Sequence, residues 1–189
     1  MAKKNTMRKG KTLRLRDDHT WKAPSGYKIV VMDAGAASFN IPVSWVLTKM
    51  EPLEVLDKEP PDDDARITVT LWRFPPGIDW SGLPLEDLLE NATNDPALKE
   101  RKERTEIKRV PRKDIEMVWK RDRWIDDEND NREAYTNIAY ARGYEAHVLI
   151  TFDYWVDDAK KFKKVWDEVV RSLILDRKIQ DPTKGERLQ

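Results

Sequence analysis

The chain has 189 residues, a length that suits one domain with short terminal extensions. Its 35 Lys and Arg balance its 35 Asp and Glu, which excludes binding to nucleic acid through a large overall positive charge. Because the chain has no cysteine, disulfides, thiolate zinc sites, iron–sulfur clusters and thiol nucleophiles are excluded too.

The first 16 residues form a basic stretch that has no apolar period and no acidic residue. Its seven cationic side chains are those of Lys3, Lys4, Arg8, Lys9, Lys11, Arg14 and Arg16. Asp17 and Asp18 follow, where a secretory signal would continue with an apolar run. No apolar run reaches the roughly 18 residues of a membrane span. We therefore expect residues 1–20 to be a flexible basic arm, and the protein to be cytoplasmic without a transmembrane segment.

Runs rich in β-branched residues predict several strands in the first half of the chain. We expect them over residues 27–32, 38–41, 45–47, 53–56 and 66–74. Gly35 separates the first two, and Pro42 ends the second. In the last run Ile67, Val69 and Leu71 alternate with polar or aromatic residues, which is the period of a half-buried strand.

A Pro- and Gly-containing loop over residues 75–84 interrupts the strands and leads into a helical insert. The residues 85–93 are expected to form a short helix. Asp95 followed by Pro96 resembles an N-cap and first-turn pair, so we predict a second helix that ends near Arg104.

In the second half, strands are expected over residues 106–110, 114–120, 133–142 and 145–155. Gly143 predicts a tight hairpin between the last two. Asp157 or Asp158 then caps the most regular helix, whose apolar face carries Phe162, Val165, Trp166, Val169, Val170 and Leu173. We expect this helix to pack on the apolar face of the last strand, which consists of Ala146, Val148, Ile150, Phe152 and Tyr154.

Strands joined by short turns, with helices between and after them, predict an α+β fold in which helices pack on an antiparallel sheet. We assign residues 21–175 to a single domain that ends with the long C-terminal amphipathic helix. The residues 176–189 are polar, contain Pro182 and Gly185, and are expected to form a C-terminal tail.

Two segments resemble the PsbP/Mog1/DcrB-like superfamily. The sequence Ser-Phe-Asn-Ile-Pro-Val-Ser-Trp, residues 38–45, is similar to the strand and Pro-x-x-Trp motif of its first part. The closing strand and helix, with Val-Val-Arg-Ser-Leu at 169–173, resemble its last helix, and the order of elements agrees over roughly residues 37–175. The resemblance implies a sheet-and-helix sandwich that binds other proteins and lacks catalytic activity. It implies no catalytic residue.

The sequence departs from that superfamily in several respects. It shows neither the lipoprotein signal of the envelope members nor the transit or secretory segment of the photosystem members. The basic arm and an acidic insertion near Pro60 are also outside the pattern. These departures leave the identity of the partner open.

Common catalytic and nucleotide-binding motifs are absent from the sequence, including the phosphate loop, Gly-x-Gly-x-x-Gly, His-Glu-x-x-His and Gly-x-Ser-x-Gly. On the last strand His147, Thr151 and Asp153 share one face, but six strand residues span about 20 Å, so His147 and Asp153 cannot touch. We expect a partly exposed sheet histidine. An enzyme that uses an unrecognised polar face near His147 is the remaining catalytic alternative.

Two acidic clusters, residues 62–64 and 126–130, raise the question of a calcium site. An EF-hand needs Gly at its sixth position and Glu at its twelfth, whereas counting from Asp126 gives Asn131 and Asn137. Solvated turns explain both clusters, and we predict no metal, no cofactor and no catalytic residue.

Three apolar residues of the loop 75–84 are candidate partner contacts: Ile78, Trp80 and Leu83. Either the loop folds back over an edge of the sheet, or Trp80 is an exposed aromatic anchor of the kind that dominates protein interfaces. We predict a non-enzymatic, protein-binding accessory or chaperone-like module. The alternative is a nucleic-acid-associated protein whose arm contacts phosphates. The simplest interpretation of the arm itself is a solubilising or disordered tail. Contact with an acidic protein or membrane surface, and folding back on its own domain, are further alternatives.

Overall fold

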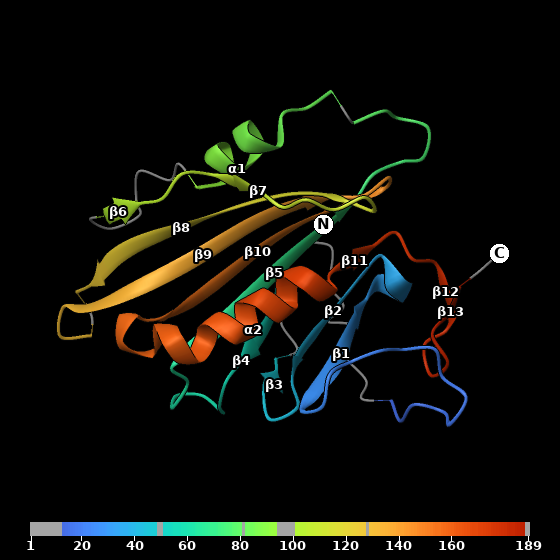
Figure 1. Cartoon of the computed structure of the whole chain (residues 1–189), viewed down its shortest axis with the longest axis horizontal. Coiled ribbons are helices and arrows are strands. Elements are labelled where there is room, and N and C mark those ends of the chain that lie inside the picture. The colour runs from blue at the N-terminus through green and yellow to red at the C-terminus, as the bar shows by residue number, and fades with distance from the viewer. Residues whose placement is uncertain (1–12, 49–50, 81, 94–100, 128, 188–189) are drawn as a thin grey trace, which may run out of the picture.

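The computed structural model describes residues 13–48, 51–80, 82–93, 101–127 and 129–187. Its principal sheet is antiparallel (Figure 1). In spatial order it contains β3 (Val46–Leu47), β4 (Leu53–Leu56), β5 (Ala65–Arg73), β10 (Ala146–Trp155), β9 (Arg132–Arg142), β8 (Glu116–Asp126) and β6 (Arg101–Arg104), and β7 (Lys108–Arg109) also pairs with β8.

Within the described ranges, two smaller sheets and two α-helices complete the fold. The first small sheet joins β1 (Tyr27–Met32), β2 (Ala37–Pro42) and β11 (Ile174–Leu175), and the second joins β12 (Ile179–Asp181) and β13 (Glu186–Arg187). The helices are α1 (Leu85–Thr93) and α2 (Ala159–Ser172), with short 3-10 turns η1 (Asp33–Gly35) and η2 (Val156–Asp158). Helix α2 lies in front of the principal sheet in Figure 1, and α1 lies above β7 and β8 in this view and packs on the other face of the sheet.

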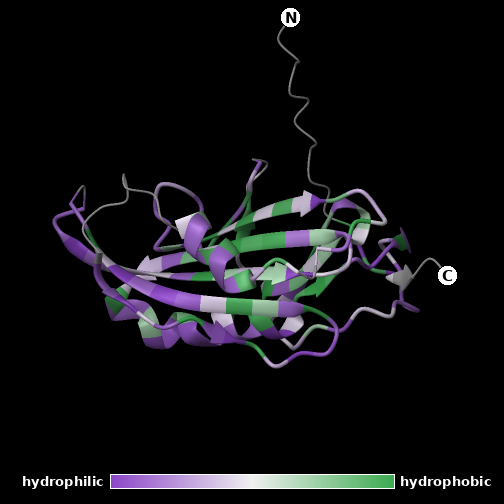
Figure 2. Cartoon of the chain, turned by 90° about the horizontal axis from the view of Figure 1, so that it is seen from above, coloured by the Kyte–Doolittle hydropathy of each residue, from purple (hydrophilic) through white to green (hydrophobic). Residues whose placement is uncertain are grey.

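The predicted α+β fold is confirmed, and most of the predicted strands are present. The period-2 pattern identified β5 because its alternate residues Ile67 and Val69 are fully buried while its other face is more exposed. The same alternation of apolar and polar residues colours the long strands in Figure 2. The strand predicted over residues 106–110 is limited to β7, and the strand predicted over residues 114–120 corresponds to the longer β8.

The predicted packing of α2 on β10 is confirmed. Val148, Ile150 and Phe152 are buried in one cluster with Phe162 and Trp166. The ring of Phe152 lies 5.8 Å from that of Phe162 and 6.2 Å from that of Trp166. The apolar stripe of the helix thus meets the apolar face of the nearest strand in sequence, and β2 packs on α2 as well.

Two features of the predicted helices differ in the structure. Asp158 occupies the N-cap position of α2, but its side chain makes no capping hydrogen bond, since η2 precedes the helix directly. The predicted second helix of the insert is wrong over Arg101–Arg104, which form strand β6, paired with β8. The sequence Arg-Lys-Glu-Arg favours a helix by propensity, but an open strand edge supplies partners for its backbone. The rest of that predicted helix falls outside the described residues.

The C-terminal residues are more ordered than the sequence predicts. Strands β12 and β13 form a hairpin that packs against the segment before β1. The indole Nε1 of Trp21 donates to the backbone oxygen of Pro182 at 2.8 Å, and the amide of Thr20 donates to that of Lys184 at 2.7 Å. A Cβ on Gly185, whose φ is +71°, would meet the Trp21 indole at 2.7 Å, so glycine is required there.

None of the helices in the described ranges combines the length and the apolar character needed to cross a bilayer.

Candidate functional site

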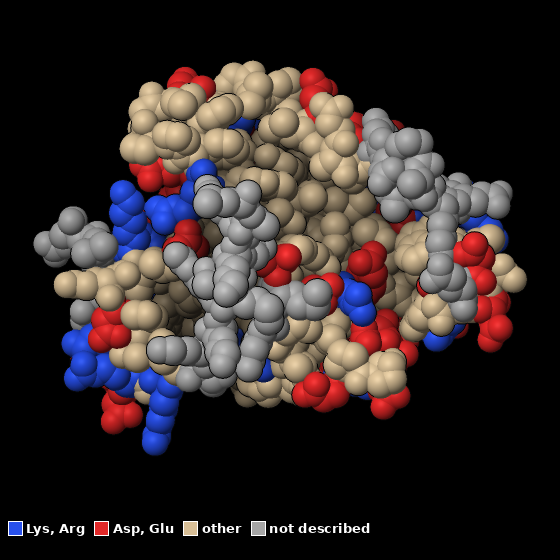
Figure 3. Space-filling model, turned by 180° about the vertical axis from the view of Figure 1, so that it is seen from behind, with Lys and Arg blue, Asp and Glu red and all other residues tan. Residues whose placement is uncertain are grey.

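The principal sheet has two faces, and we call the one turned away from α2 the outer face. Across it Trp72, His147, Arg142 and Glu116 lie side by side on β5, β10, β9 and β8. Figure 3 views the molecule from the side away from α2, where uncharged side chains gather in the upper middle and charged ones lie around them. This face therefore combines an uncharged centre with a polar margin.

Helix α1 covers the part of the outer face that β8 and β9 form. Its Leu85 and Leu89 are buried against Val118, Ile138 and Tyr140, in a core separate from the one beneath α2. The loop 75–84 immediately precedes this helix, so the packing of α1 also holds the end of the loop.

A buried arginine on β9 holds the loop 75–84 through hydrogen bonds to its backbone. The Arg142 Nη1 donates hydrogen bonds to the backbone oxygens of Trp80 and of Leu83, the latter at 2.8 Å. Its Nη2 donates to Glu116 Oε2 at 2.7 Å. One cation thus satisfies two loop carbonyls and is itself neutralised, as a buried charge requires.

The three loop residues that the sequence singled out lie in different environments. Trp80 is half-buried, and its ring packs 4.5 Å from that of Phe74. Ile78 and Leu83 are 47% and 40% exposed, and Trp72 on the adjacent strand is 39% exposed. The loop therefore folds back through Trp80 and presents Ile78 and Leu83 to solvent, and their role in partner binding stays a prediction.

His147 is buried, which corrects the expectation of a partly exposed histidine. It is 1% exposed, its Nδ1 is hydrogen-bonded to the Tyr140 hydroxyl at 3.0 Å, and the Phe74 ring packs 4.6 Å away. The alternation along the strand predicts which face of the sheet His147 occupies, but not that this position is covered. Phe74 and the loop residue Trp80 pack against the imidazole and enclose it. Asp153 is hydrogen-bonded to Thr136 instead, so the two residues are apart as predicted.

The enclosed His147 predicts an acid-sensitive stability. Burial, aided by the charge of Arg142, lowers the pKa of His147 from its usual 6.5. Because the unfolded state then binds a proton that the native state does not, the free energy of unfolding should fall as pH drops below about 6.5, by at most about 1.4 kcal/mol per unit. Urea unfolding between pH 5 and 7 measures this slope.

The variant His147→Gln should remove that part of the pH dependence, while the exposed His19→Gln should retain it. Equal slopes for the wild type and the His147→Gln variant would contradict the assignment.

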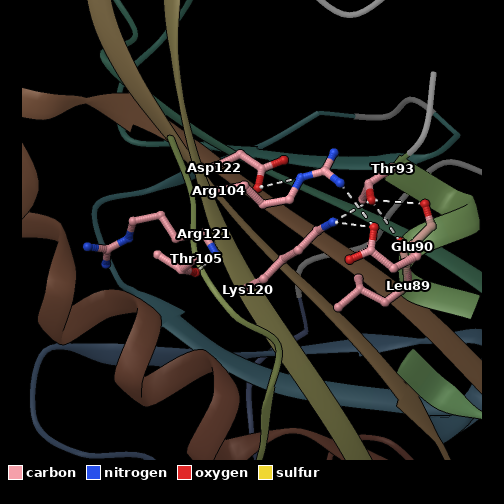
Figure 4. A network of polar contacts seen from close by, with 8 residues as sticks. All are labelled: Leu89, Glu90, Thr93, Arg104, Thr105, Lys120, Arg121 and Asp122. Atoms are coloured by element: carbon pink, nitrogen blue, oxygen red, sulfur yellow. Dashed lines mark hydrogen bonds and ion pairs between the residues drawn. The ribbon is translucent and has the colours of Figure 1, made fainter. Parts of the chain in front are cut away.

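A polar network fastens α1 to β8 (Figure 4). Lys120 on β8 is fully buried, and its Nζ donates to Thr93 Oγ1 at 2.7 Å and to Glu90 Oε2 at 3.3 Å. Arg104 on β6 donates to the same Glu90 carboxylate at 3.1 Å and lies 3.7 Å from Asp122. Burial raises the pKa of Asp122, while the charges of Lys120 and Arg104 act in the opposite direction.

Sequence analysis did not identify this network, because it predicted only a strand over residues 114–120 and no contact for the second face of that strand. Val118, Lys120 and Asp122 alternate on that face, and a single apolar residue beside two charges gives a weak signal. The amphipathic pattern of α1 was the available clue, since its Leu85 and Leu89 need a surface to cover.

A family model described as Alr1449 matches residues 28–179 of the chain. The chain belongs to the Alr1449 family. A relative, the uncharacterized protein alr1449 of Nostoc sp., is 38% identical to this chain over 175 residues. The match covers 92% of this chain and 90% of that protein.

Solved structures share the fold of this Alr1449-family chain at low sequence identity. The cyanobacterial PsbP (CyanoP) of Synechocystis sp. has a TM-score of 0.61 at 12% identity, and the match covers 82% of this chain and 95% of that one. The Ran-binding protein Mog1p of Saccharomyces cerevisiae has a TM-score of 0.53 at 11% identity, covering 79% and 95%. LpqN of Mycobacterium tuberculosis, involved in cell envelope biogenesis, has a TM-score of 0.52 at 10% identity, covering 80% and 85%. The PsbP/Mog1-like fold is thereby confirmed.

The basic arm of this Alr1449-family protein is described only at its end. Five of its predicted contacts fall outside the described residues: Lys3, Lys4, Arg8, Lys9 and Lys11. Arg14 is exposed. Arg16 lies 3.7 Å from Asp18 and 4.0 Å from Asp181, and its amide donates to the oxygen of Thr183 at 3.1 Å. Beyond Arg16, the segment is therefore tied to the C-terminal hairpin.

Carboxylates of the acidic turn at residues 62–64 form ion pairs with nearby basic side chains. Asp64 pairs with Lys58, and Asp63 lies 3.3 Å from Arg66. Within the described ranges, no three His, Asp or Glu side chains are grouped so that they could hold a metal ion. The geometry of this turn is that of a charged surface loop.

Proposed function

We propose that this Alr1449-family protein is a non-enzymatic accessory module that binds another protein through its outer face. The contact surface consists of Trp72, Ile78 and Leu83, which we call the outer patch. The observation that carries the proposal is the way in which Arg142 and Trp80 hold the loop 75–84 in place while Ile78 and Leu83 stay exposed.

Preorganisation makes such a loop suited to binding. A loop that is already anchored loses little conformational entropy when it contacts a partner, so more of the interaction energy appears as affinity. Large apolar side chains at the centre of an uncharged area, with a charged margin, are the usual arrangement of a protein interface. The outer patch consists of large exposed apolar side chains, and the same face of the molecule has an uncharged area with charged side chains around it (Figure 3).

The enclosed position of His147 supports a non-enzymatic role. His147 is the one histidine within the folded strands, and it lies behind Phe74, Tyr140 and the loop rather than in an open pocket. The same fold occurs in a protein that binds Ran, Mog1p, which supports a binding role for this fold without identifying a partner here.

The experiment compares capture of proteins from a lysate of the source organism. The double variant Ile78→Ser with Leu83→Ser should reduce the captured partner at least about tenfold, since two interface residues each contribute 1 kcal/mol or more. The matched control, Val43→Ser with Leu47→Ser, removes two apolar side chains of comparable exposure elsewhere and should capture the same proteins as the wild type.

Quantitative mass spectrometry of the captured proteins measures the difference, and circular dichroism verifies that both variants are folded. An identical set of partners for the wild type and the outer-patch variant would refute the proposed surface.

The alternative function, nucleic-acid contact through the basic arm, stays a prediction, as does a cytoplasmic location. Among the described residues of the arm, Arg16 already pairs with carboxylates of the chain itself. That observation favours the outer patch as the first candidate.

A further inference from the structure

A pocket on the opposite side of the sheet is independent of the outer patch. It lies between α2 and the strands β7 and β8, and it has a volume of about 290 Å³. Its walls carry two indoles and several charged groups, those of Lys108, Trp119, Arg121, Lys163, Trp166 and Asp167. We call it the β8–α2 pocket, and its volume is at the lower end of small-molecule sites.

The guanidinium of Arg121 is held in a fixed orientation within this pocket. Its Nε donates to Asn137 Oδ1 at 2.7 Å, and Asn137 is fully buried and hydrogen-bonded to the Tyr154 hydroxyl at 3.2 Å. The guanidinium also stacks on the Tyr135 ring, 4.8 Å from its centre. In Figure 4 the Arg121 side chain extends toward α2, away from the Lys120 network. A rigid cation of this kind is a preorganised site for an oxyanion.

The two cations on the strand side of the pocket, those of Arg121 and Lys108, are not neutralised by any described residue. In the described part of the chain no carboxylate lies within ion-pairing distance of Arg121 or Lys108, whereas the nearby Arg104, Arg109 and Arg123 each have at least one. Lys108 instead lies over the Trp119 ring, 5.6 Å from its centre. The strand side therefore offers two positive charges that no carboxylate of the described residues pairs with.

The remaining walls favour a flat apolar group. The rings of Trp119 and Trp166 lie 5.7 Å apart and tilted at 60°, and Trp119 is only half-buried. On the helix side, Lys163 and Asp167 neutralise each other at 2.5 Å. The pocket thus joins an aromatic surface to a net positive charge from Arg121 and Lys108.

We propose that the β8–α2 pocket binds a small aromatic anion, consisting of one ring that carries a carboxylate or phosphate group. The oxyanion accepts hydrogen bonds from Arg121 and pairs with Lys108, and the ring lies against Trp119. Such a ligand of about ten non-hydrogen atoms fits the volume, and contacts of this number and kind correspond to a Kd of about 1 mM.

Isothermal titration of the full chain with phenyl phosphate tests this site. Saturable binding is expected, with inorganic phosphate and benzyl alcohol each binding at least about tenfold more weakly because they supply only one half of the ligand. Benzoate tests whether a carboxylate serves as well as a phosphate. No saturation by phenyl phosphate or benzoate at about 20 mM, far above the expected Kd, would overturn the proposal, and equal affinity for inorganic phosphate would overturn its aromatic part.

Variants assign the binding to this pocket. Arg121→Gln and, separately, Lys108→Gln should each weaken phenyl phosphate binding at least about tenfold, the value for one lost charge-assisted hydrogen bond. The Lys108 variant changes an exposed side chain, so it keeps the test valid if the Arg121 variant does not fold. The control Lys160→Gln removes an exposed cation of α2 outside the pocket and should leave the affinity unchanged. Wild-type affinity in both pocket variants would overturn the assignment.

Discussion

Replacement of Phe152 by alanine is expected to cost about 3–5 kcal/mol of the free energy of unfolding. The side chain is fully buried between β10 and α2, and its ring contacts those of Trp45, Phe162 and Trp166 at 5.8–6.2 Å. Removing it leaves a cavity where the rigid aromatic cluster cannot collapse. Because domains have only about 5–15 kcal/mol of stability, this is a large share.

Urea unfolding followed by tryptophan fluorescence measures the change in midpoint at constant slope. If the alanine variant does not fold, Phe152→Leu keeps most of the volume and should cost about 1–1.5 kcal/mol. The control Tyr144→Ala, at a side chain 71% exposed, should change the stability by less than about 0.5 kcal/mol. A loss below about 1 kcal/mol for Phe152→Ala would contradict the packing of α2 on β10.

Replacement of Lys120 by methionine should cost about 3 kcal/mol at neutral pH. Methionine has a similar volume but has no ammonium group for Thr93 and Glu90, and it withdraws a charge that stabilises the buried Asp122 carboxylate. The main penalty is therefore a buried negative charge that has lost a compensating positive one. Hydrogen exchange should also show reduced protection in α1, because Lys120 connects this helix to β8.

The pH dependence identifies that cause. Without Lys120 the native pKa of Asp122 rises further above its unfolded value, so the native state gains stability as the carboxylate becomes protonated. The deficit of Lys120→Met relative to the wild type should thus shrink as pH falls, and adding Asp122→Asn should recover part of it at pH 7. The control Lys160→Met, on the exposed face of α2, should be nearly neutral. A deficit that does not change with pH would rule out the charge explanation.

The two proposed surfaces lie on opposite faces of the sheet. The outer patch depends on Arg142 and Trp80, whereas the β8–α2 pocket depends on Arg121 and its buried partner Asn137. A failure of partner capture would therefore leave the anion site unaffected, and the reverse also holds.

Elements with a strong hydrophobic period were predictable from the sequence. Strand β5 has the alternation of a half-buried strand, and α2 has an apolar stripe of helical spacing, so their type and inward faces followed directly. Strand β6 was not predictable in this way. Its four residues are all charged, and the pairing with β8 rather than any local preference makes it a strand.

The candidate site was predictable only in part. The loop position and its apolar residues were evident from the sequence, because Pro and Gly interrupt the strand just before them. Which of these residues are covered was not evident. Arg142, which binds the backbone oxygen of Trp80, is far from the loop in sequence, and the tertiary structure brings the two together.

Composition and periodicity alone established an α+β chain with a helix packed on its last strand, and excluded all cysteine chemistry. Those properties depend on neighbours within a few residues, which a sequence records directly. The burial of His147, the enclosed Lys120 and the fixed guanidinium of Arg121 were decided by the tertiary structure. Each depends on groups brought together from separate elements, and the free energy of a buried polar group is set by those distant partners.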